Sequence, residues 1–235
     1  DGENYQKAKV FLKPIAEHVS EEYKGNMHQA LLIDGFDVEL HGRLPIEISH
    51  CADKVIDEVV ADSCNRGICS WKNGVVDVPL PNPDNHIFLV FTHFLNHFFI
   101  EGVGLRQICD WCRLLWTYKG SLNHGLLESR IRKMGLLSEW KVFASLAVDT
   151  LGMPVEAMPF YDSRFKVKGV KVLKRVLKSG NLGHNNDLSY RTRYSGFSYK
   201  IVAAWRRFLD FASLEPVFPV DAPKFFFTYL FQKAN

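Results

Sequence analysis

The sequence predicts an α+β fold in which a small α/β part is followed by a larger all-helical lobe. Near the N-terminus, two short apolar segments flank Asp34-Gly35, a dipeptide that favours the tight turn of a β-hairpin. From about residue 84 onward, apolar residues recur at helical spacing through a series of longer segments. With 235 residues, 47% of them hydrophobic and 18 of them Phe, the chain is long enough to bury a well-filled core.

The N-terminal part is expected to contain two helices and two hairpins. Pro14 should kink or end the first helix, because proline lacks the backbone N–H that continues a helix. In chain order, the elements are a helix at 3–19, strands at 28–33 and 36–41, a helix at 52–64 and a second hairpin around Asn73-Gly74.

A stiff proline-rich link separates the two parts. Pro79, Pro81 and Pro83 stand at alternate positions, and we place the domain boundary there. This gives a partial α/β domain at 1–80 and a helical domain at 81–235. The expected helices of the second domain are 84–101, 104–118, 122–134, 136–151, 166–179, 197–213 and 221–232.

Composition narrows the class of protein. A net charge of only +3 gives no global signal for binding polyanions. The five cysteines are an odd number without a recognisable secretory signal, which indicates reduced thiols in a cytoplasmic protein. Cys109 and Cys112 share one helix face, and we favour core packing over a metal or redox role because no second pair with ligand spacing accompanies them. The apolar run from Ile87 to Ile100 is interrupted by polar residues, so no membrane span is expected.

A polar stripe crosses the very apolar helical hairpin of residues 86–116. His93, His97 and Glu101 are spaced four apart and should share one helix face, and Arg106 and Asp110 repeat this spacing after the turn. Polar groups in an apolar setting are costly unless they are paired. The stripe is therefore either a satisfied internal network or one wall of a site.

Two motifs carry a family resemblance. The segment 101–107, E-G-V-G-L-R-Q, preceded by two histidines one helical turn apart, and the strand Val38-Glu39-Leu40-His41 occur in this order. Together they resemble the uncharacterised bacterial nucleotidyltransferases of the polymerase-β superfamily. The resemblance implies that residues 1–80 are a small remnant of a nucleotidyltransferase-type α/β sheet. Members of that superfamily carry a D-x-D pair that is not found in this sequence, and we expect the chain to begin just after it and to be weakly active or inactive as given.

The resemblance also implies a catalytic carboxylate. Glu39 would take the place of the third acidic residue and bind Mg²⁺ or act as general base, with His41 supporting it. Strand alternation independently puts Asp37, Glu39 and His41 on one face and Val38 and Leu40 on the other. The alternative is an ordinary solvated strand face.

Phosphate contacts are expected from the helical lobe. Arg106 would hold a triphosphate and Asp110 would orient it, or the two would form a simple exposed ion pair. His93 and His97 would line the cleft, whereas a metal site there would need a ligand from another element. Lys171 and Lys174 lie in the basic segment 164–193, which could attract a nucleotide, an acidic glycan or RNA, although a solvated face is the more common outcome.

The predicted function is Mg²⁺-dependent transfer of a nucleotidyl group from an NTP to an unidentified hydroxyl acceptor. The alternative is a non-catalytic helical interaction module that binds a protein, glycan or RNA partner. A sheet with so few strands exposes an edge, which a homodimer or a further segment could cover.

Overall fold

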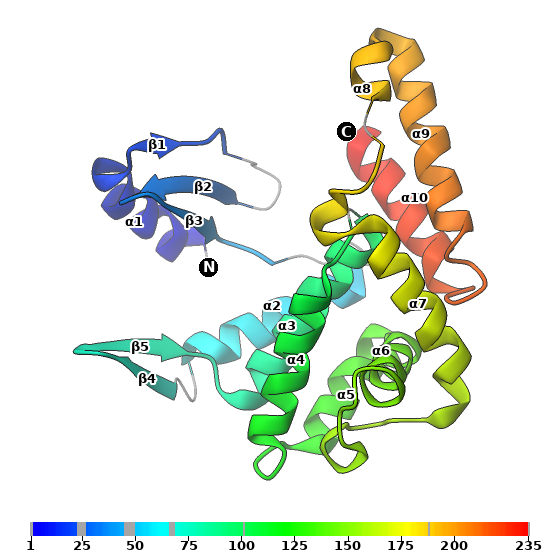
Figure 1. The fold of residues 1–235 in the computed structure, drawn as a ribbon. Helices are drawn as coiled ribbons and strands as arrows, with labels where there is room; N and C mark the ends of the chain where they lie inside the picture. Colours follow the sequence, from blue (N-terminus) through cyan, green and yellow to red (C-terminus); the bar gives the residue numbers. More distant parts are fainter. Residues whose placement is uncertain are drawn as a thin grey trace.

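The protein has an α+β fold with two small antiparallel sheets and a helical lobe, as predicted (Figure 1). This computed structural model describes residues 2–22, 27–44, 50–65, 69–100, 102–187 and 189–234. The N-terminal elements are α1 (Gly2–Leu12), η1 (Lys13–Ile15), β1 (His18–Val19), β2 (His28–Ile33), β3 (Phe36–His41), α2 (His50–Asn65), β4 (Cys69–Asn73) and β5 (Val76–Leu80).

The first sheet has the strand order β1-β2-β3, with both pairs antiparallel. β2 and β3 have the predicted bounds. Asp34 and Gly35 between them have φ values of 51° and 76°, the positive values that this kind of tight turn requires. α1 packs against β3 and buries Tyr5, which has an exposed fraction of only 3%. One face of the sheet is thus covered by a helix, and the other carries its polar side chains.

The prediction of a helix through residue 19 is wrong beyond the first part of the segment. α1 ends at Leu12, a 3-10 turn follows through Pro14, and the chain then forms β1. The ring of proline disfavours helical geometry in the residue before it, so the α-helix stops here. His18 and Val19 instead pair with Leu32 and Leu31 on the free edge of β2.

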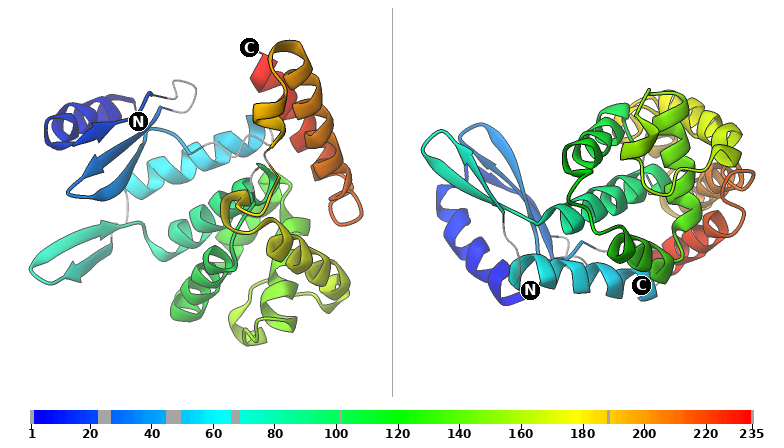
Figure 2. Two further views of the ribbon diagram at one scale, coloured as in Figure 1. Left: turned by 45° about the horizontal axis from the view of Figure 1, so that its top comes forward. Right: turned by 90° about the horizontal axis from the view of Figure 1, so that it is seen from below.

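β4 and β5 form the second hairpin, which confirms the prediction around Asn73-Gly74. Gly74 has a φ of 63°, a conformation that glycine adopts without strain. The two strands extend away from the helices in Figures 1 and 2, and every residue of β4 is exposed.

The helical lobe contains one large apolar core. Its helices are α3 (Pro83–Ile100), α4 (Leu105–Tyr118), α5 (His124–Met134), α6 (Leu137–Asp149), α7 (Lys166–Ser179), α8 (Tyr190–Arg193), α9 (Gly196–Ala212) and α10 (Asp221–Ala234), with short 3-10 turns at η2 (Val155–Ala157), η3 (Ser163–Phe165) and η4 (Asn181–Gly183). Phe91 lies at the centre, in contact with Phe94, Trp111 and Trp140. Aromatic pairs of this kind add to the apolar burial.

α2 shares this core although it precedes the predicted boundary. Its buried residues Ala52, Val55, Ile56 and Val59 belong to the same cluster as those of α3, and α2 contacts both α3 and α5. The domain division at residues 80 and 81 stays a prediction. In the part of the chain that is described, no helix combines the length and the apolar character that a membrane crossing needs.

The aromatic C-terminal helix docks onto the lobe. Phe225 is 2% exposed and stacks on Phe99, with ring centroids 3.9 Å apart and planes inclined by 15°. α10 lies beside α9 in both orientations of the molecule, and the two close one end of the lobe (Figures 1 and 2).

Candidate functional site

The hairpin register brings a histidine from β2 next to the predicted residues of β3. His28 is the direct partner of His41, and Ala30 is the partner of Glu39. Side chains alternate along a strand, so His28, Glu39 and His41 emerge on the same face. The two imidazole rings stack, with centroids 4.4 Å apart and planes inclined by 11°.

The Glu39 carboxylate lies near the Nε2 atoms of both rings. Its Oε2 atom is 3.2 Å from Nε2 of His41 and 3.9 Å from Nε2 of His28. The three donor atoms lie within 4.8 Å of one another. In the described parts of the chain, no other group of three or more His, Cys, Asp or Glu residues is gathered this closely. We call His28, Glu39 and His41 the strand cluster.

His28 contributes a buried ring nitrogen to the strand cluster. Its Nε2 is buried and has no hydrogen-bond partner, whereas the Glu39 side chain is 60% exposed. Burial lowers the pKa of His28, the proximity of His41 lowers it further, and Glu39 opposes both effects. The ring is therefore biased toward the neutral form, whose unprotonated nitrogen can bind a metal or accept a proton.

α3 approaches the strand cluster with the two predicted histidines. The rings of His93 and His97 meet edge to face at 4.6 Å. His93 is at the surface, yet desolvation by its neighbours lowers its pKa, with further lowering by His97 and His41 and a smaller raising effect of Glu39. His93 is thus within electrostatic range of the sheet, and its place in the wall of a cleft stays a prediction. Glu101 lies outside the described residues.

Arg106 and Asp110 form an exposed ion pair on α4. Their charged atoms are 3.9 Å apart, and the side chains are 92% and 62% exposed. Such a pair contributes little to stability because water screens it. The guanidinium of Arg106 is consequently held only loosely and remains accessible to an anion.

Side chains of the protein itself cover the N-terminal start of α4. Nε2 of Gln107 donates a hydrogen bond of 2.8 Å to Oδ1 of Asn181. A Cβ atom placed on Gly104 would stand 3.2 Å from the same oxygen. The side chain of Asn181 therefore covers the N-terminal end of α4 beside Gly104.

In the basic segment 164–193, some cationic side chains are exposed to solvent and others contact neighbouring parts of the chain. Lys171 and Lys174 are exposed on α7, which lies on the far side of α3 and α4 from the sheet (Figures 1 and 2). The structure does not bring them to the strand cluster. Lys168 donates through Nζ to the carbonyl oxygen of Val217 at 2.7 Å, and Arg175 donates through Nη1 to Oγ of Ser213, also at 2.7 Å. Those two cations fasten α7 to the chain between α9 and α10.

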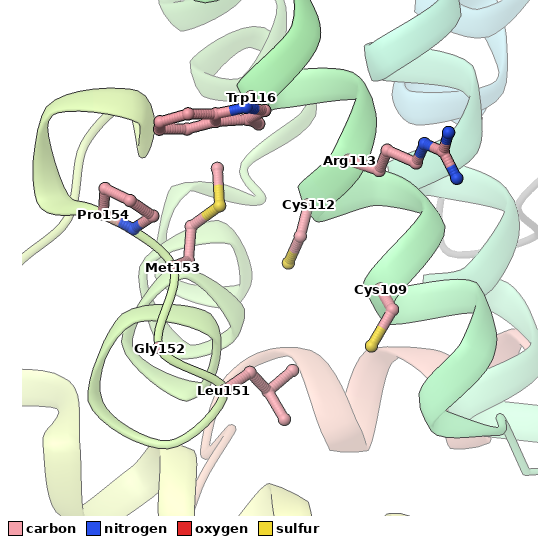
Figure 3. A pocket seen from close by; sticks show the side chains of 8 residues that line it. All are labelled: Cys109, Cys112, Arg113, Trp116, Leu151, Gly152, Met153 and Pro154. Carbon is pink, nitrogen blue, oxygen red and sulfur yellow. The ribbon is translucent and has the colours of Figure 1, made fainter.

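A shallow open pocket of about 350 Å³ lies elsewhere on the lobe, between α4 and the turn after α6. In Figure 3 the indole of Trp116 lies over the side chain of Met153, the Cys112 thiol points toward the pocket, and Arg113 points away. Burial raises the pKa of the Cys112 thiol to about 12. That thiol is protonated and unreactive at neutral pH. None of the predicted site residues lines this pocket.

The expectation that both cysteines of the Cys109/Cys112 pair lie in the core is wrong for Cys109. The buried stripe of α4 is formed by Ile108, Trp111 and Leu115. Cys109 is one position past this stripe and is exposed, and Cys112 at its edge is partly buried.

His28 is the site residue that was missed. No sequence motif marks it, because it reaches the cluster through cross-strand pairing rather than through spacing along one strand. The two-residue Asp34-Gly35 loop contained the signal. Once that loop is assigned, residues 28 and 41 must face each other, as the structure shows.

The expected Mg²⁺ does not fit the strand cluster. Mg²⁺ prefers an octahedron of oxygen ligands and keeps several of its waters. The cluster offers one carboxylate and two imidazoles, and Asp37, on the same strand face, is not part of it. Among the described residues, the strand cluster by itself therefore lacks the set of oxygen ligands that Mg²⁺ prefers.

Comparison with known proteins identifies the family. Residues 3–152, more than half of the chain, match the model of a family described as uncharacterised nucleotidyltransferase. The matched region includes the sheet, both hairpins and α2 to α6. No curated protein and no solved structure matches the chain.

Proposed function

The chain belongs to the uncharacterised nucleotidyltransferase family, and on this basis we propose that it acts in the transfer of a nucleotidyl group from a nucleoside triphosphate to a hydroxyl acceptor. The observation that supports the proposal is the pairing of Glu39 with His41 at 3.2 Å on the exposed face of β3. Both residues lie in the matched region. Their side chains are partly solvent-accessible, so a substrate can reach them.

In such a transfer the acceptor oxygen attacks the α-phosphorus. A bond forms between these two atoms, the bond from the α-phosphorus to the bridging oxygen breaks, and pyrophosphate leaves. The acceptor hydroxyl must lose its proton on the way. The Glu39–His41 pair accepts this proton in our proposal, because a carboxylate beside an imidazole orients the ring and stabilises its protonated form.

The helical lobe holds the nucleotide in this proposal. Arg106 presents an exposed planar guanidinium that suits the paired oxygens of a phosphate. Asp110 orients Arg106 until an anion replaces it. His93 and His97 line the side of the cleft that faces the strand cluster. Lys171 and Lys174 attract the anion only from a distance, since α7 lies beyond α3 and α4.

Calorimetric titration of ATP and CTP, each with Mg²⁺, tests the proposal on residues 1–235. We expect measurable binding that Glu39→Ala and Arg106→Ala each weaken at least tenfold. Asp77→Ala and Arg113→Ala are matched controls, because the first removes an exposed strand carboxylate and the second an exposed arginine of α4. Absence of binding to the unmodified chain, or equal losses in the controls, would remove this site as the place of nucleotide binding.

A second candidate function is a non-catalytic interaction module. The observation in its favour is the exposed apolar face of α9, where Phe197 is 78%, Ile201 is 53% and Trp205 is 59% exposed. Large exposed apolar patches often mark contact surfaces. If neither ATP nor CTP binds, the interaction module becomes the favoured interpretation. Variants of Phe197, Ile201 and Trp205 would then be compared with the unmodified protein for partner binding.

A further inference from the structure

We propose that His28, Glu39 and His41 form a binding site for Zn²⁺ rather than for Mg²⁺. The proposal concerns metal binding by this chain and does not require that it transfers nucleotides. It follows from the donor types, the distances between them and an unsatisfied nitrogen.

The donor types favour a borderline metal ion. Zn²⁺ accepts imidazole nitrogen and carboxylate oxygen, and two histidines with one acidic residue are a known ligand set for it. Mg²⁺ binds oxygen almost exclusively in proteins. Two of the three donors of the strand cluster are nitrogen atoms, so the cluster discriminates against Mg²⁺.

The distances match a shared ion. Ligand bonds to Zn²⁺ are about 2.0–2.2 Å long, so two donors at a tetrahedral angle are about 3.4 Å apart. The observed separations from Oε2 of Glu39 are 3.2 Å to His41 and 3.9 Å to His28. Both separations are within about 0.5 Å of this value, and all three donors lie within 4.8 Å of one another.

The imidazole planes must also rotate. They are now nearly parallel, with 11° between them, whereas an ion bound to both Nε2 atoms has to lie close to both ring planes. Rotation about the side-chain bonds achieves this, and the side chains of His28 and His41 are 33% and 29% exposed. Neither ring is locked in a tightly packed core.

An unsatisfied nitrogen independently indicates a missing partner. Nε2 of His28 is buried and makes no hydrogen bond. A buried polar atom without a partner destabilises the fold, and this atom lies 3.9 Å from Oε2 of Glu39. A bound ion would supply the missing partner. Three protein ligands leave one tetrahedral position open, as in catalytic zinc sites.

Metal titration of the chain, freed of metal by a chelator and carrying no polyhistidine tag, tests the proposal in the absence of nucleotide. We expect one Zn²⁺ per chain by calorimetry, and no displacement by a large excess of Mg²⁺. Co²⁺ should give the visible absorption of a tetrahedral site with nitrogen and oxygen ligands. A strong charge-transfer band from thiolate would instead assign the metal to cysteines and overturn the proposal.

Variants locate the site. His28→Ala and Glu39→Gln should each lower the Zn²⁺ affinity by at least about tenfold, the lower end of the loss seen when even supporting groups of a metal site are removed. His18→Ala is the matched control, because His18 is an exposed histidine of the same sheet outside the strand cluster. Glu39→Gln keeps the size of an exposed side chain, so its folding, checked by circular dichroism, is not at risk. Equal affinities of the three variants would overturn the proposal.

These measurements separate the two proposals. Zn²⁺ binding that depends on His28, together with no binding of ATP or CTP, would support the metal site and reject the nucleotide site. Nucleotide binding without specific Zn²⁺ binding would support the nucleotide site and reject the metal site.

Discussion

Glu139 of α6 and Asp221 at the start of α10 place two carboxyl groups side by side in the interior. Their residues are 0% and 7% exposed. No donor reaches either oxygen of Glu139 in the described residues, while Nζ of Lys224 is 3.3 Å from Asp221. Burial, and then Asp221 as hydrogen-bond partner and as a negative charge, raise the pKa of Glu139 well above its usual range. Burial and the neighbouring carboxylate therefore favour the protonated, neutral form of Glu139 in the folded protein.

This arrangement predicts a stabilising effect of Glu139→Gln at high pH. The folded protein retains a proton that the unfolded chain loses above about pH 4.5, so the free energy of unfolding falls as pH rises from there toward the raised pKa. Each unit of increase in pKa corresponds to about 1.4 kcal/mol. In urea unfolding, we expect the free energy of unfolding of Glu139→Gln to exceed that of the unmodified protein by at least about 1.4 kcal/mol at pH 8. The difference should be smaller at pH 5. Glu156→Gln, at an exposed position, is the control, and a gain that does not change with pH would contradict the assignment.

His86 predicts a loss of stability in mild acid. Burial lowers the pKa of its imidazole in the folded protein, so the unfolded chain takes up a proton first as pH falls through about 6.5. The stabilising contribution is present above that pH and is lost below it. NMR titration should give a midpoint for His86 below 6.5, and urea unfolding should show a smaller decrease between pH 7.5 and 5.5 for His86→Gln than for the unmodified protein. An identical decrease in both would show that other groups are responsible.

The buried hydrogen bonds of Asn85 predict a large loss in the free energy of unfolding when its side chain is truncated. The residue is fully buried; its Nδ2 donates to Asp62 and Ser63, and its Oδ1 accepts from Arg130. These contacts join α2, α3 and α5. Asn85→Ala leaves several buried partners unsatisfied, and we expect a loss of about 2–4 kcal/mol in the free energy of unfolding. Asn73→Ala, on the exposed β4, should change it by less than about 0.5 kcal/mol.

The surroundings of Gly102 predict that this position of the E-G-V-G-L-R-Q motif requires glycine. Its φ is 126°, and an added Cβ would stand 2.9 Å from the backbone nitrogen of Gly183 and 3.1 Å from the backbone oxygen of Gly180. Backbone atoms cannot move aside as a flexible side chain can. Gly102→Ala should therefore destabilise the protein by about 2 kcal/mol or more, measured by thermal unfolding. Gly120→Ala, with open space around it, is the control, and equal melting temperatures for the two variants would refute this role.

The elements predicted correctly are those with strong local signals. Asp34-Gly35 determined the first hairpin because few other residues adopt positive φ at two successive positions. The helices from α3 to α7 followed from apolar periodicity, which is robust in long segments. The resemblance rested on two local sequence motifs, one in β3 and one in the α3–α4 turn, and it pointed to the family that residues 3–152 match.

The features that were missed depend on contacts between distant segments. β1 has two residues and forms only because the free edge of β2 accepts it. Arg175 belongs to the basic segment 164–193, for which a solvated face is the more common outcome, but its guanidinium donates to Ser213 and lies over the ring of Phe98. Charge pattern on a single helix does not reveal such tertiary partners.

The two-residue connection between β2 and β3 has a consequence for how the strand cluster can change. The three donors share a face only because the number of residues in this connection fixes which positions meet. A shift of the pairing by a single residue would turn Glu39 and His41 toward α1 and leave His28 on the opposite face. The arrangement of the cluster therefore depends on the register that this short connection sets, as well as on the three side chains themselves.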